Sequence, residues 1–169
     1  MKYSLILIVM LMQIVVVQAQ SPEEKLAELG ITLREPGEPV ATYVNWRRVG
    51  NMLYIAGTAD INVKGRVGKD LTVEEGYEAA RLSGIQILSV IKSAIGDLSK
   101  IKQFVRVHGM VNSSPDFFDQ PKVINGFSDL MFEVFGEKGL HARAAVGHSV
   151  LPFNVTVEIE VTVELEDGN

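Results

Sequence analysis

The last third of the chain alternates strictly between apolar and polar residues. From position 155 to position 165, every odd-numbered residue is Val, Ile or Leu, and every even-numbered residue is Thr or Glu. Because successive side chains of a strand point to opposite faces of a sheet, this pattern predicts a strand with one buried and one polar face. Residues 142–150 predict a second strand, and residues 151–154, which contain Pro152, predict the turn that joins the two.

The strand over residues 142–150 places one long cation among small side chains. Alternation puts Arg143 on the same face as Ala145, Gly147 and Ser149. An Arg with open space around its guanidinium, beside a row of Glu on the adjoining strand, forms either a surface ion pair or an anion-binding pocket. The pattern alone favours the ion pair, because such pairs are common on sheet faces.

Two stretches have the spacing of amphipathic helices. The first starts at a capping box formed by Thr72 and Glu75 and stops near Gly96. The second starts with Pro121 near its first position and stops at Gly136. Apolar residues fall at helical intervals in both, at positions 77, 80, 85, 88, 91, 95 and 98 and at positions 123, 124, 127, 130, 131, 134 and 135.

A short helix and an extended segment precede these elements. The stretch 21–24 has the sequence of a helix start, with a Ser N-cap, a Pro in the first turn and a Glu that closes a capping box, and Gly30 ends this helix. Residues 33–39 contain two prolines and a glycine, which predicts an extended connector. We therefore expect a helix and connector over residues 20–39 and a single domain over residues 40–169.

The remaining strand signals complete a simple order of elements. Residues 40–48 and 52–59 predict a hairpin with its turn at 49–51, and residues 101–111 predict one further strand. The expected order is therefore strand, strand, helix, strand, helix, strand, strand. Two amphipathic helices and one alternating sheet are typical of a two-layer α+β domain, with a mixed sheet and both main helices on one face.

The face of the sheet away from the helices is then expected to carry Arg143, Glu158 and Glu160, together with small residues and threonines. This face is too polar for a second helix layer, so we expect it to face water or another copy of the chain. A ring of subunits joined through such faces would place polar groups at the subunit boundaries, where ligand clefts are common.

Composition limits the classes of function. The 169 residues, 47% of them hydrophobic, suffice for one domain with its own core. The net charge of −5 and the lack of any Lys/Arg cluster argue against a nucleic-acid partner, because phosphate binding needs a basic face. The absence of Cys excludes thiol nucleophiles, iron–sulfur sites and disulfides. The sequence also has no nucleophile elbow, no HExxH motif and no Gly-rich nucleotide loop.

The histidines do not suggest a metal site. His108, His141 and His148 are spread over three positions outside the predicted helices, and no Cys is present to join them. A structural metal site needs about four converging ligands. We therefore expect His108 and His148 to be core or interface residues, and we expect neither metal nor cofactor.

The N-terminus has the features of a secretory leader. Lys2 gives a cationic start, residues 5–17 are almost entirely apolar, and the sequence Val17-Gln18-Ala19 provides a small-x-small cleavage site. The apolar run is shorter than the ~20 residues of a spanning helix and fits a signal peptide. We expect a signal peptide over residues 1–19, export to the periplasm or the medium, and no stable membrane anchor after cleavage. An uncleaved anchor is the alternative.

Arg143 and Glu158 are the best candidates for chemistry. The planar guanidinium of an Arg can hold a carboxylate through two hydrogen bonds. A Glu on the adjoining strand could activate a water molecule or move a proton, provided that burial adjusts its pKa. A structural ion pair between the two residues is the alternative that the pattern leaves open.

Three stretches of the sequence resemble the Rid family, the reactive intermediate imine deaminases of YjgF type. Ala142-Arg143-Ala144-Ala145-Val146, followed by Leu151-Pro152 and Val157-Glu158-Ile159-Glu160, resembles the C-terminal signature of that family. Residues 39–57 resemble its first hairpin, and residues 123–126 resemble the start of its second helix. Residues 71–81 and 116–129 are most similar to the branch labelled endoribonuclease L-PSP or chorismate-mutase-like.

This resemblance implies a fold, a reaction and a site. The family has a chorismate-mutase-like α+β fold, assembled as a homotrimer with ligand clefts between subunits. Its best-known members hydrolyse enamines or imines such as 2-aminoacrylate to a 2-keto acid and ammonia without metal or cofactor. By position, Arg143 matches the Arg that binds the substrate carboxylate, and Glu158 matches the residue that activates water. Tyr43 and Asn125 match residues of the same cleft, and Ala145 occupies a position in its wall.

The sequence departs from the family pattern at three positions near the cleft. Ala145 stands where the family often has Cys, Ala56 where it has Ser, and His141 where it commonly has Pro or Ala. The anion-binding Arg is kept while the pocket wall changes. We therefore favour an exported imine deaminase, with a non-catalytic binder of small carboxylates as the alternative. A ribonuclease is less well supported, because the chain is acidic and has no basic groove.

Overall fold

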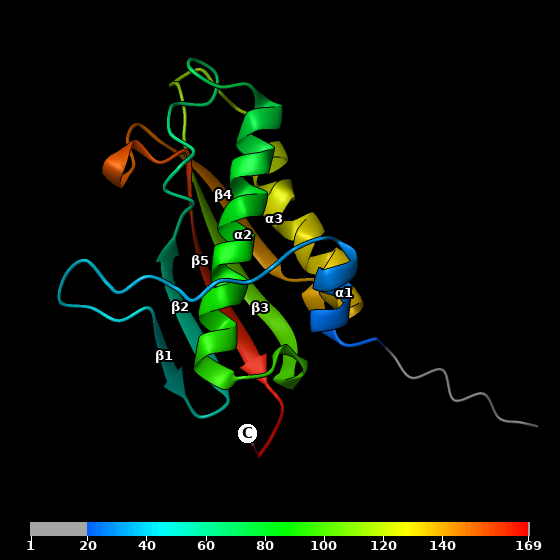
Figure 1. Ribbon diagram of the computed structural model, residues 1–169. Coiled ribbons are helices and arrows are strands. Elements are labelled where there is room, and N and C mark those ends of the chain that lie inside the picture. Colours follow the sequence, from blue (N-terminus) through cyan, green and yellow to red (C-terminus); the bar gives the residue numbers. More distant parts are fainter. Residues whose placement is uncertain (1–19, 169) are drawn as a thin grey trace, which may run out of the picture.

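The computed structural model describes residues 20–168, which form one five-stranded sheet with two long helices against the same face (Figure 1). In chain order the helices and strands are α1 (Pro22–Glu28), β1 (Trp46–Val49), β2 (Met52–Thr58), α2 (Val73–Ile95), β3 (Ile101–Asn112), α3 (Gln120–Phe135), β4 (Ala142–His148) and β5 (Val157–Leu165). Short 3-10 helices lie at Leu98–Lys100, Gly136–Gly139 and Pro152–Asn154. The predicted order of elements and the two-layer α+β architecture are confirmed.

Local sequence sets the helix starts as predicted. The Ser21 hydroxyl accepts a hydrogen bond from the backbone N–H of Glu24, and the Glu24 carboxylate accepts one from the N–H of Ser21. Thr72 and Glu75 form the same reciprocal pair at the start of α2. Each box satisfies two backbone donors that the first helical turn leaves without partners. Gly96, with a φ of 78°, ends α2 in a conformation that favours glycine.

The core lies between the two helices and the apolar face of the sheet. The five odd-numbered residues of β5 are each at most 2% exposed, which confirms the predicted alternation. They are Val157, Ile159, Val161, Val163 and Leu165. Full burial of such a side chain contributes about 1.5–3 kcal/mol, so this strand alone supplies a large share of the hydrophobic stabilisation.

The last two strands are not neighbours in the sheet. The strand order is β1-β2-β5-β3-β4, so β3 lies between β4 and β5. β3 pairs with β4 in parallel and with β5 antiparallel. The connection crosses over β3 through the Pro152–Asn154 turn, in which Phe153 and Asn154 have positive φ values of 55° and 60°. The expectation that Arg143 and Glu158 lie on adjoining strands is therefore wrong.

The first hairpin forms, but its first strand is shorter than predicted. β1 covers only Trp46–Val49, and it pairs with β2 through the expected turn. Residues 40–45 are held instead by local contacts, among them a hydrogen bond from the Asn45 side chain to the carbonyl of Gly37 at 2.8 Å. The strand is at the edge of the sheet, and its residues are exposed, so little burial favours its extension.

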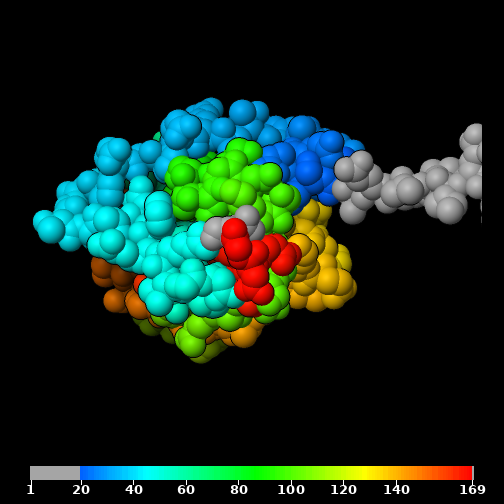
Figure 2. Space-filling view, turned by 90° about the horizontal axis from the view of Figure 1, so that it is seen from below, coloured from blue at the N-terminus to red at the C-terminus, as the bar shows by residue number. Residues whose placement is uncertain are grey.

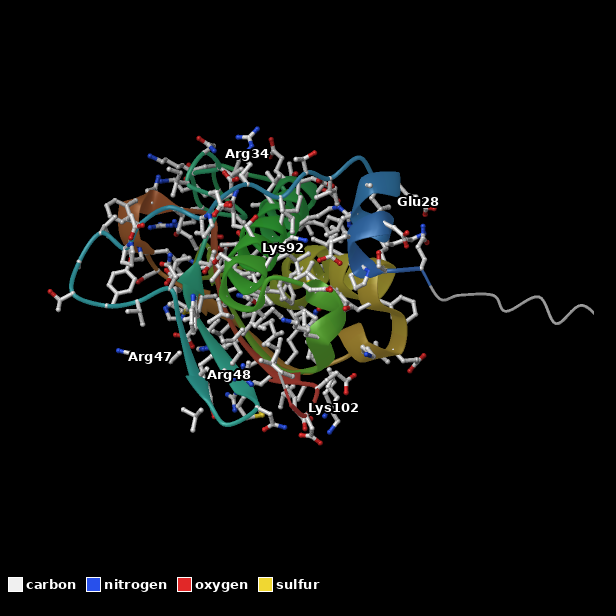
Figure 3. The ribbon with its side chains drawn as sticks, turned by 60° about the horizontal axis from the view of Figure 1, so that its bottom comes forward. Glu28, Arg34, Arg47, Arg48, Lys92 and Lys102 are labelled. Atoms are coloured by element: carbon white, nitrogen blue, oxygen red, sulfur yellow. The ribbon has the colours of Figure 1, made fainter. Side chains whose placement is uncertain are left out.

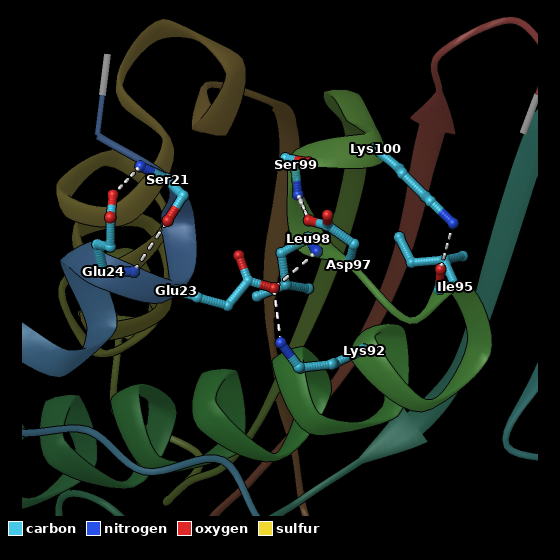
Figure 4. A network of polar contacts seen from close by, with 9 residues as sticks. All are labelled: Ser21, Glu23, Glu24, Lys92, Ile95, Asp97, Leu98, Ser99 and Lys100. Atoms are coloured by element: carbon cyan, nitrogen blue, oxygen red, sulfur yellow. Dashed lines mark hydrogen bonds and ion pairs between the residues drawn. The ribbon is translucent and has the colours of Figure 1, made fainter. Parts of the chain in front are cut away.

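The N-terminal helix is attached to the helix layer. A Glu23 carboxylate oxygen accepts hydrogen bonds from the Lys92 ammonium at 2.7 Å and from the backbone N–H of Leu98 at 2.9 Å (Figure 4). Leu26 buries its side chain in the core at 2% exposure. Figure 2 shows this segment, in blue, against the green region around the end of α2. The predicted signal peptide at residues 1–19 lies outside the described residues, and no helix over residues 20–168 is long and apolar enough to cross a membrane.

The contact between α2 and α3 yields a stability prediction at Gly126. A Cβ added at this position would clash with the backbone carbonyl oxygen of Tyr77 in α2. Helix propensity alone would favour Ala, but relief of the clash requires the two helices to separate. We expect Gly126→Ala to destabilise the fold by about 2 kcal/mol or more, measured as a lower urea midpoint. Gly37→Ala is the matched control, since its added Cβ meets no atom within 4 Å; equal stability of the two variants would contradict the packing described.

Candidate functional site

Arg143 extends from the edge strand β4 to helix α3. Its Nη1 group donates hydrogen bonds to Asn125 Oδ1 at 2.9 Å and to Ser128 Oγ at 3.0 Å. Asn125 and Ser128 lie one turn apart on α3 and therefore present their oxygens to the same guanidinium nitrogen. No carboxylate of residues 20–168 forms an ion pair with Arg143, so the Nε–Nη2 edge is left for a ligand. Asn125, which the family resemblance implies to be in the same cleft as Arg143, is thus in direct contact with it.

Arg143 and Glu158 lie on opposite faces of the sheet. Arg143 is in register with Val107, and Val107 is in register with Val161 on the face that the helices cover. Glu158 is in register with Met110, on the uncovered face. The expectation that Arg143 shares the open face with Glu158 and Glu160 is therefore wrong. β3 lies between β4 and β5, and its pairing register with each strand determines which side chains point to which face.

This arrangement prevents the two residues from holding one small acid within a single chain. Two strand spacings and three residues along the strand separate their Cα atoms by roughly 14 Å, and their side chains point away from each other. The structural ion pair between Arg143 and Glu158 is excluded for the same reason. We call the surroundings of these two residues the Arg143 half-site and the Glu158 half-site.

A histidine contacts the Arg143 half-site through Ser128. His141 Nδ1 lies 2.7 Å from the carbonyl oxygen of Gly139, and Nε2 lies 3.1 Å from Ser128 Oγ. A carbonyl can only accept, so Nδ1 carries the proton and Nε2 of the neutral ring accepts from the Ser128 hydroxyl. The lone pairs of Ser128 Oγ then face Arg143. Every donor in this chain of hydrogen bonds therefore meets an acceptor.

The environment keeps His141 neutral. Burial lowers the pKa of its imidazole, and the positive charge of Arg143 lowers the pKa further, against an opposing effect of the hydrogen bond to Gly139. The edge of the ring also packs against Phe127, with the ring centres 5.6 Å apart. Sequence reasoning noted His141 only as a departure from the family pattern, and it missed Ser128. The i,i+3 spacing of Asn125 and Ser128 places both side chains on one face of the helix, and this spacing could have indicated Ser128.

The Glu158 half-site lies on the uncovered face of β5. Its carboxylate rests over Gly57 of β2, where an added Cβ would clash with Glu158 Oε1. Partial burial raises the pKa of Glu158, the negative charge of Glu160 raises it further, and His148 opposes both. A carboxyl group with a raised pKa exchanges protons at a pH closer to neutrality, which suits general acid–base chemistry. His148 is exposed, and His108 is half-buried beside Glu160, with Nδ1 and Oε2 3.5 Å apart.

The other predicted cleft residues lie in separate parts of the chain. Ala145 lies two residues after Arg143 on the same face and packs against the core. Ala56 is in β2, next to Gly57. Tyr43 precedes β1, at the edge of the sheet opposite to β4, and is 49% exposed. The described residues include no group of three or more His, Asp or Glu side chains placed to hold a metal ion.

Comparison with known proteins gives one family over nearly the whole described chain. Residues 23–165 match the model of the family described as "YjgF/chorismate_mutase-like, putative endoribonuclease". Protein TCP17 of Trypanosoma cruzi is 42% identical over 148 residues, which cover 84% of this chain and 92% of that protein. A 2-iminobutanoate/2-iminopropanoate deaminase of Dermatophagoides farinae is 26% identical over 129 residues, which cover 76% and 90%.

A solved structure from Shewanella oneidensis has a closely similar fold. It superposes with a TM-score of 0.84 and 34% sequence identity, over 86% of this chain and all of that chain. That protein is described as a "putative endoribonuclease". The likeness supports the mixed five-stranded sheet and the helix layer as the common architecture.

The raised pKa of Glu158 predicts a pH-dependent stability. The folded state holds the Glu158 proton to a higher pH than the unfolded state does, so ionisation favours unfolding as the pH rises through this range. We therefore expect Glu158→Gln to be more stable than the wild type at neutral pH, with the gain vanishing as the pH falls below the pKa of an unfolded Glu. Urea unfolding across this pH range measures the difference in stability between variant and wild type. Glu78→Gln, at an exposed position of α2, is the control. A destabilised Glu158→Gln at neutral pH would contradict the assigned environment.

The charge of Arg143 predicts a shift in the titration of His141. Removal of the guanidinium takes away a positive charge that disfavours the imidazolium, so Arg143→Ala should raise the pKa of His141. NMR titration of the imidazole resonances measures this change. Arg47→Ala, on β1 at the other edge of the sheet (Figure 3), should leave the His141 titration unchanged. An unchanged His141 pKa in Arg143→Ala would show that the ring and the guanidinium are not coupled.

Proposed function

The chain belongs to the YjgF/chorismate mutase-like family, and we propose that it hydrolyses small 2-imino acids or their enamine forms to 2-keto acids and ammonia. The observation that carries this proposal is the Arg143 guanidinium, which is oriented by Asn125 and Ser128 and has one edge unpaired. That edge can hold the carboxylate of a 2-imino acid through two parallel hydrogen bonds. The similarity to an imine deaminase of a mite supports the reaction class.

The proposed site forms between copies of the chain. Arg143 of one copy and Glu158 of the next would flank one ligand, since a single chain holds them on opposite faces of its sheet. The uncovered face offers a surface for such assembly, with Tyr54 at 46% exposure and Val146 at 37%. Exposed apolar side chains on an uncovered sheet face favour contact with another subunit. A homotrimer closes this contact into a ring.

The reaction follows from these positions. Arg143 fixes the substrate carboxylate, and Glu158 accepts a proton from a water molecule as that water attacks the imine carbon. Starting from the protonated imine, the nitrogen of the resulting amino alcohol takes that proton back from Glu158. The C–N bond then breaks as the hydroxyl proton passes to Glu158, which gives the 2-keto acid and ammonia, and the ammonia carries the last proton away as ammonium. Water is the only co-reactant, and Glu158 ends the cycle in its starting state. The raised pKa of Glu158 makes both the uptake and the return of the proton accessible near neutral pH.

The proposal places this reaction outside the cytoplasm. The support is the sequence of residues 1–19 alone, with its cationic start, apolar run and small-x-small site.

A non-catalytic binder of small carboxylates is the second candidate. Ala145 and Ala56 replace polar residues in the expected pocket wall, while the Arg143 half-site is complete. This candidate predicts that 2-keto acids bind in a manner that depends on Arg143, without any turnover of imines.

Imine hydrolysis provides the direct test. Imines are generated with an amino-acid oxidase, and their removal is followed as reduced semicarbazone formation. We expect Arg143→Ala to lower kcat/KM about a hundredfold, because two charge-assisted hydrogen bonds are lost, and Glu158→Gln to lower kcat. Arg47→Ala is the matched control and should retain full activity. Wild-type protein that removes no imine but binds 2-keto acids by calorimetry would favour the binder.

Mixed assemblies test the composite site. If Arg143 and Glu158 act from different copies, chains with Arg143→Ala and chains with Glu158→Gln can form boundaries that contain both wild-type side chains. If equal amounts of the two chains assort at random, about a quarter of all boundaries contain both wild-type side chains. We therefore expect the co-expressed mixture to recover up to about a quarter of wild-type activity, well above the activity of either variant alone. A mixture as inactive as its components would contradict the site between copies.

A further inference from the structure

A cavity lies at the end of the sheet, beside the end of β4. It has a volume of about 290 Å³ and is lined by the loop at Arg66, the chain after β3, the start of α3 and the end of β4. Neither Arg143 nor Glu158 contributes to its lining. These loops lie together at the top of Figure 1, around the start of α2. Arg143 lies four residues before Gly147 on β4, which places it roughly 13 Å away along the strand.

One serine hydroxyl that lines this cavity has no hydrogen-bond partner among the described residues. Ser113 is only 4% exposed, and its Oγ makes no hydrogen bond among the described residues. Ser114 Oγ also has no partner, but it is fully buried beside Gly68 and is not accessible from the cavity. Their backbone N–H groups are both used, donating to His148 O and Val67 O at 3.0 Å. The Ser113 hydroxyl is therefore free to donate a hydrogen bond to a molecule bound in the cavity.

Glycine at position 147 keeps the cavity open. A Cβ at Gly147 would lie 2.6 Å from Gln120 Nε2 and 2.7 Å from Ser113 Oγ. The Gln120 amide is held in place, because Nε2 donates to the carbonyl of Phe117 at 2.6 Å. Ser113 Oγ and the Gln120 amide therefore border a space that any larger residue at position 147 would fill.

The cavity is positively polarised. Arg66 uses Nη2 to donate to the carbonyl of Ser149 at 2.8 Å, which fixes the guanidinium and leaves its other donors available. The 16-residue helix α3 starts at the cavity, and Asp119 gives it no side-chain cap. This helix start offers few free donors, because Pro121 has no N–H and the N–H of Lys122 donates to the Asp119 carbonyl at 2.9 Å, so Arg66 supplies the positive charge. No carboxylate lines the cavity; the nearby Asp70 accepts from the backbone N–H of Arg66 at 3.0 Å.

We propose that this cavity binds the oxyanion group of a small organic molecule, either a phosphate or a carboxylate. The Arg66 guanidinium would balance its charge, and the Ser113 hydroxyl would donate to one of its oxygens. Phe117 and the largely exposed Phe118 line the same cavity and provide an apolar surface for the rest of the molecule. The ligand class is therefore an anionic group attached to a compact apolar or aromatic body.

Binding of phenyl phosphate, inorganic phosphate and benzoate to the purified protein tests this proposal. Calorimetry gives the affinities, and amide chemical shifts locate the site. We expect Arg66→Ala to weaken binding of the preferred probe about tenfold or more, because one charge-assisted contact is lost. Ser113→Ala should weaken it as well, and Gly147→Ala should abolish it by filling the space. The preference between phenyl phosphate and benzoate identifies the anion.

The controls separate this site from the proposed active site. Arg143→Ala should bind the probes as the wild type does, and Arg47→Ala controls for the loss of a surface cation. Circular dichroism checks that Gly147→Ala is folded, and the conservative Ser113→Ala gives a second measure if it is not. Binding that is lost in Arg143→Ala but kept in Arg66→Ala would overturn the proposal, as would the absence of binding by all three probes.

Discussion

The central position of β3 governs the rest of the structure. This strand pairs with β4 on one edge and with β5 on the other, so the register of each pairing decides which side chains meet on each face. Gly109 of β3 also lets α3 lie close to the sheet, since a Cβ there would come within 2.6 Å of Ile124 Cδ1. That close approach brings the oxygens of α3 within reach of a side chain from β4.

The anchoring of Arg143 follows from this packing. The guanidinium is held by two neutral oxygens, from Asn125 and Ser128, and not by a carboxylate. Neutral acceptors fix its orientation without neutralising its charge, which leaves the cation available to an anionic ligand. His141, kept neutral by burial, orients the Ser128 hydroxyl in turn. A carboxylate in the same place would have made the site a closed ion pair.

The uncovered face has the opposite electrostatic character. Glu158 and Glu160 lie on it together, and their mutual repulsion and partial burial favour the protonated form of Glu158. A cation on one face at one edge of the sheet and a protonatable acid on the other face cannot cooperate within a chain. In the proposed assembly, the edge of one copy would meet the face of another, and the two groups would flank one ligand without neutralising each other within a chain.

Much of the local structure could be predicted from sequence. The alternation over residues 155–165, the capping boxes at Ser21 and Thr72 and the helical spacing of the apolar residues all describe interactions within a few residues, and all three appear in the fold. The match to a family signature also placed Arg143 beside Asn125, because both positions carry the residues of a known pattern.

The tertiary structure alone decided the rest. The sequence has no signal for the insertion of β3 between β4 and β5, because strand order depends on long-range pairing and not on local propensity. That insertion moved Arg143 to the helix-covered face, brought Ser128 and His141 to it, and left Glu158 on the opposite side. The cavity at Arg66 draws on four separate segments and has no motif. Local periodicity thus determined which faces are apolar, while the pairing of distant strands determined which charged groups meet.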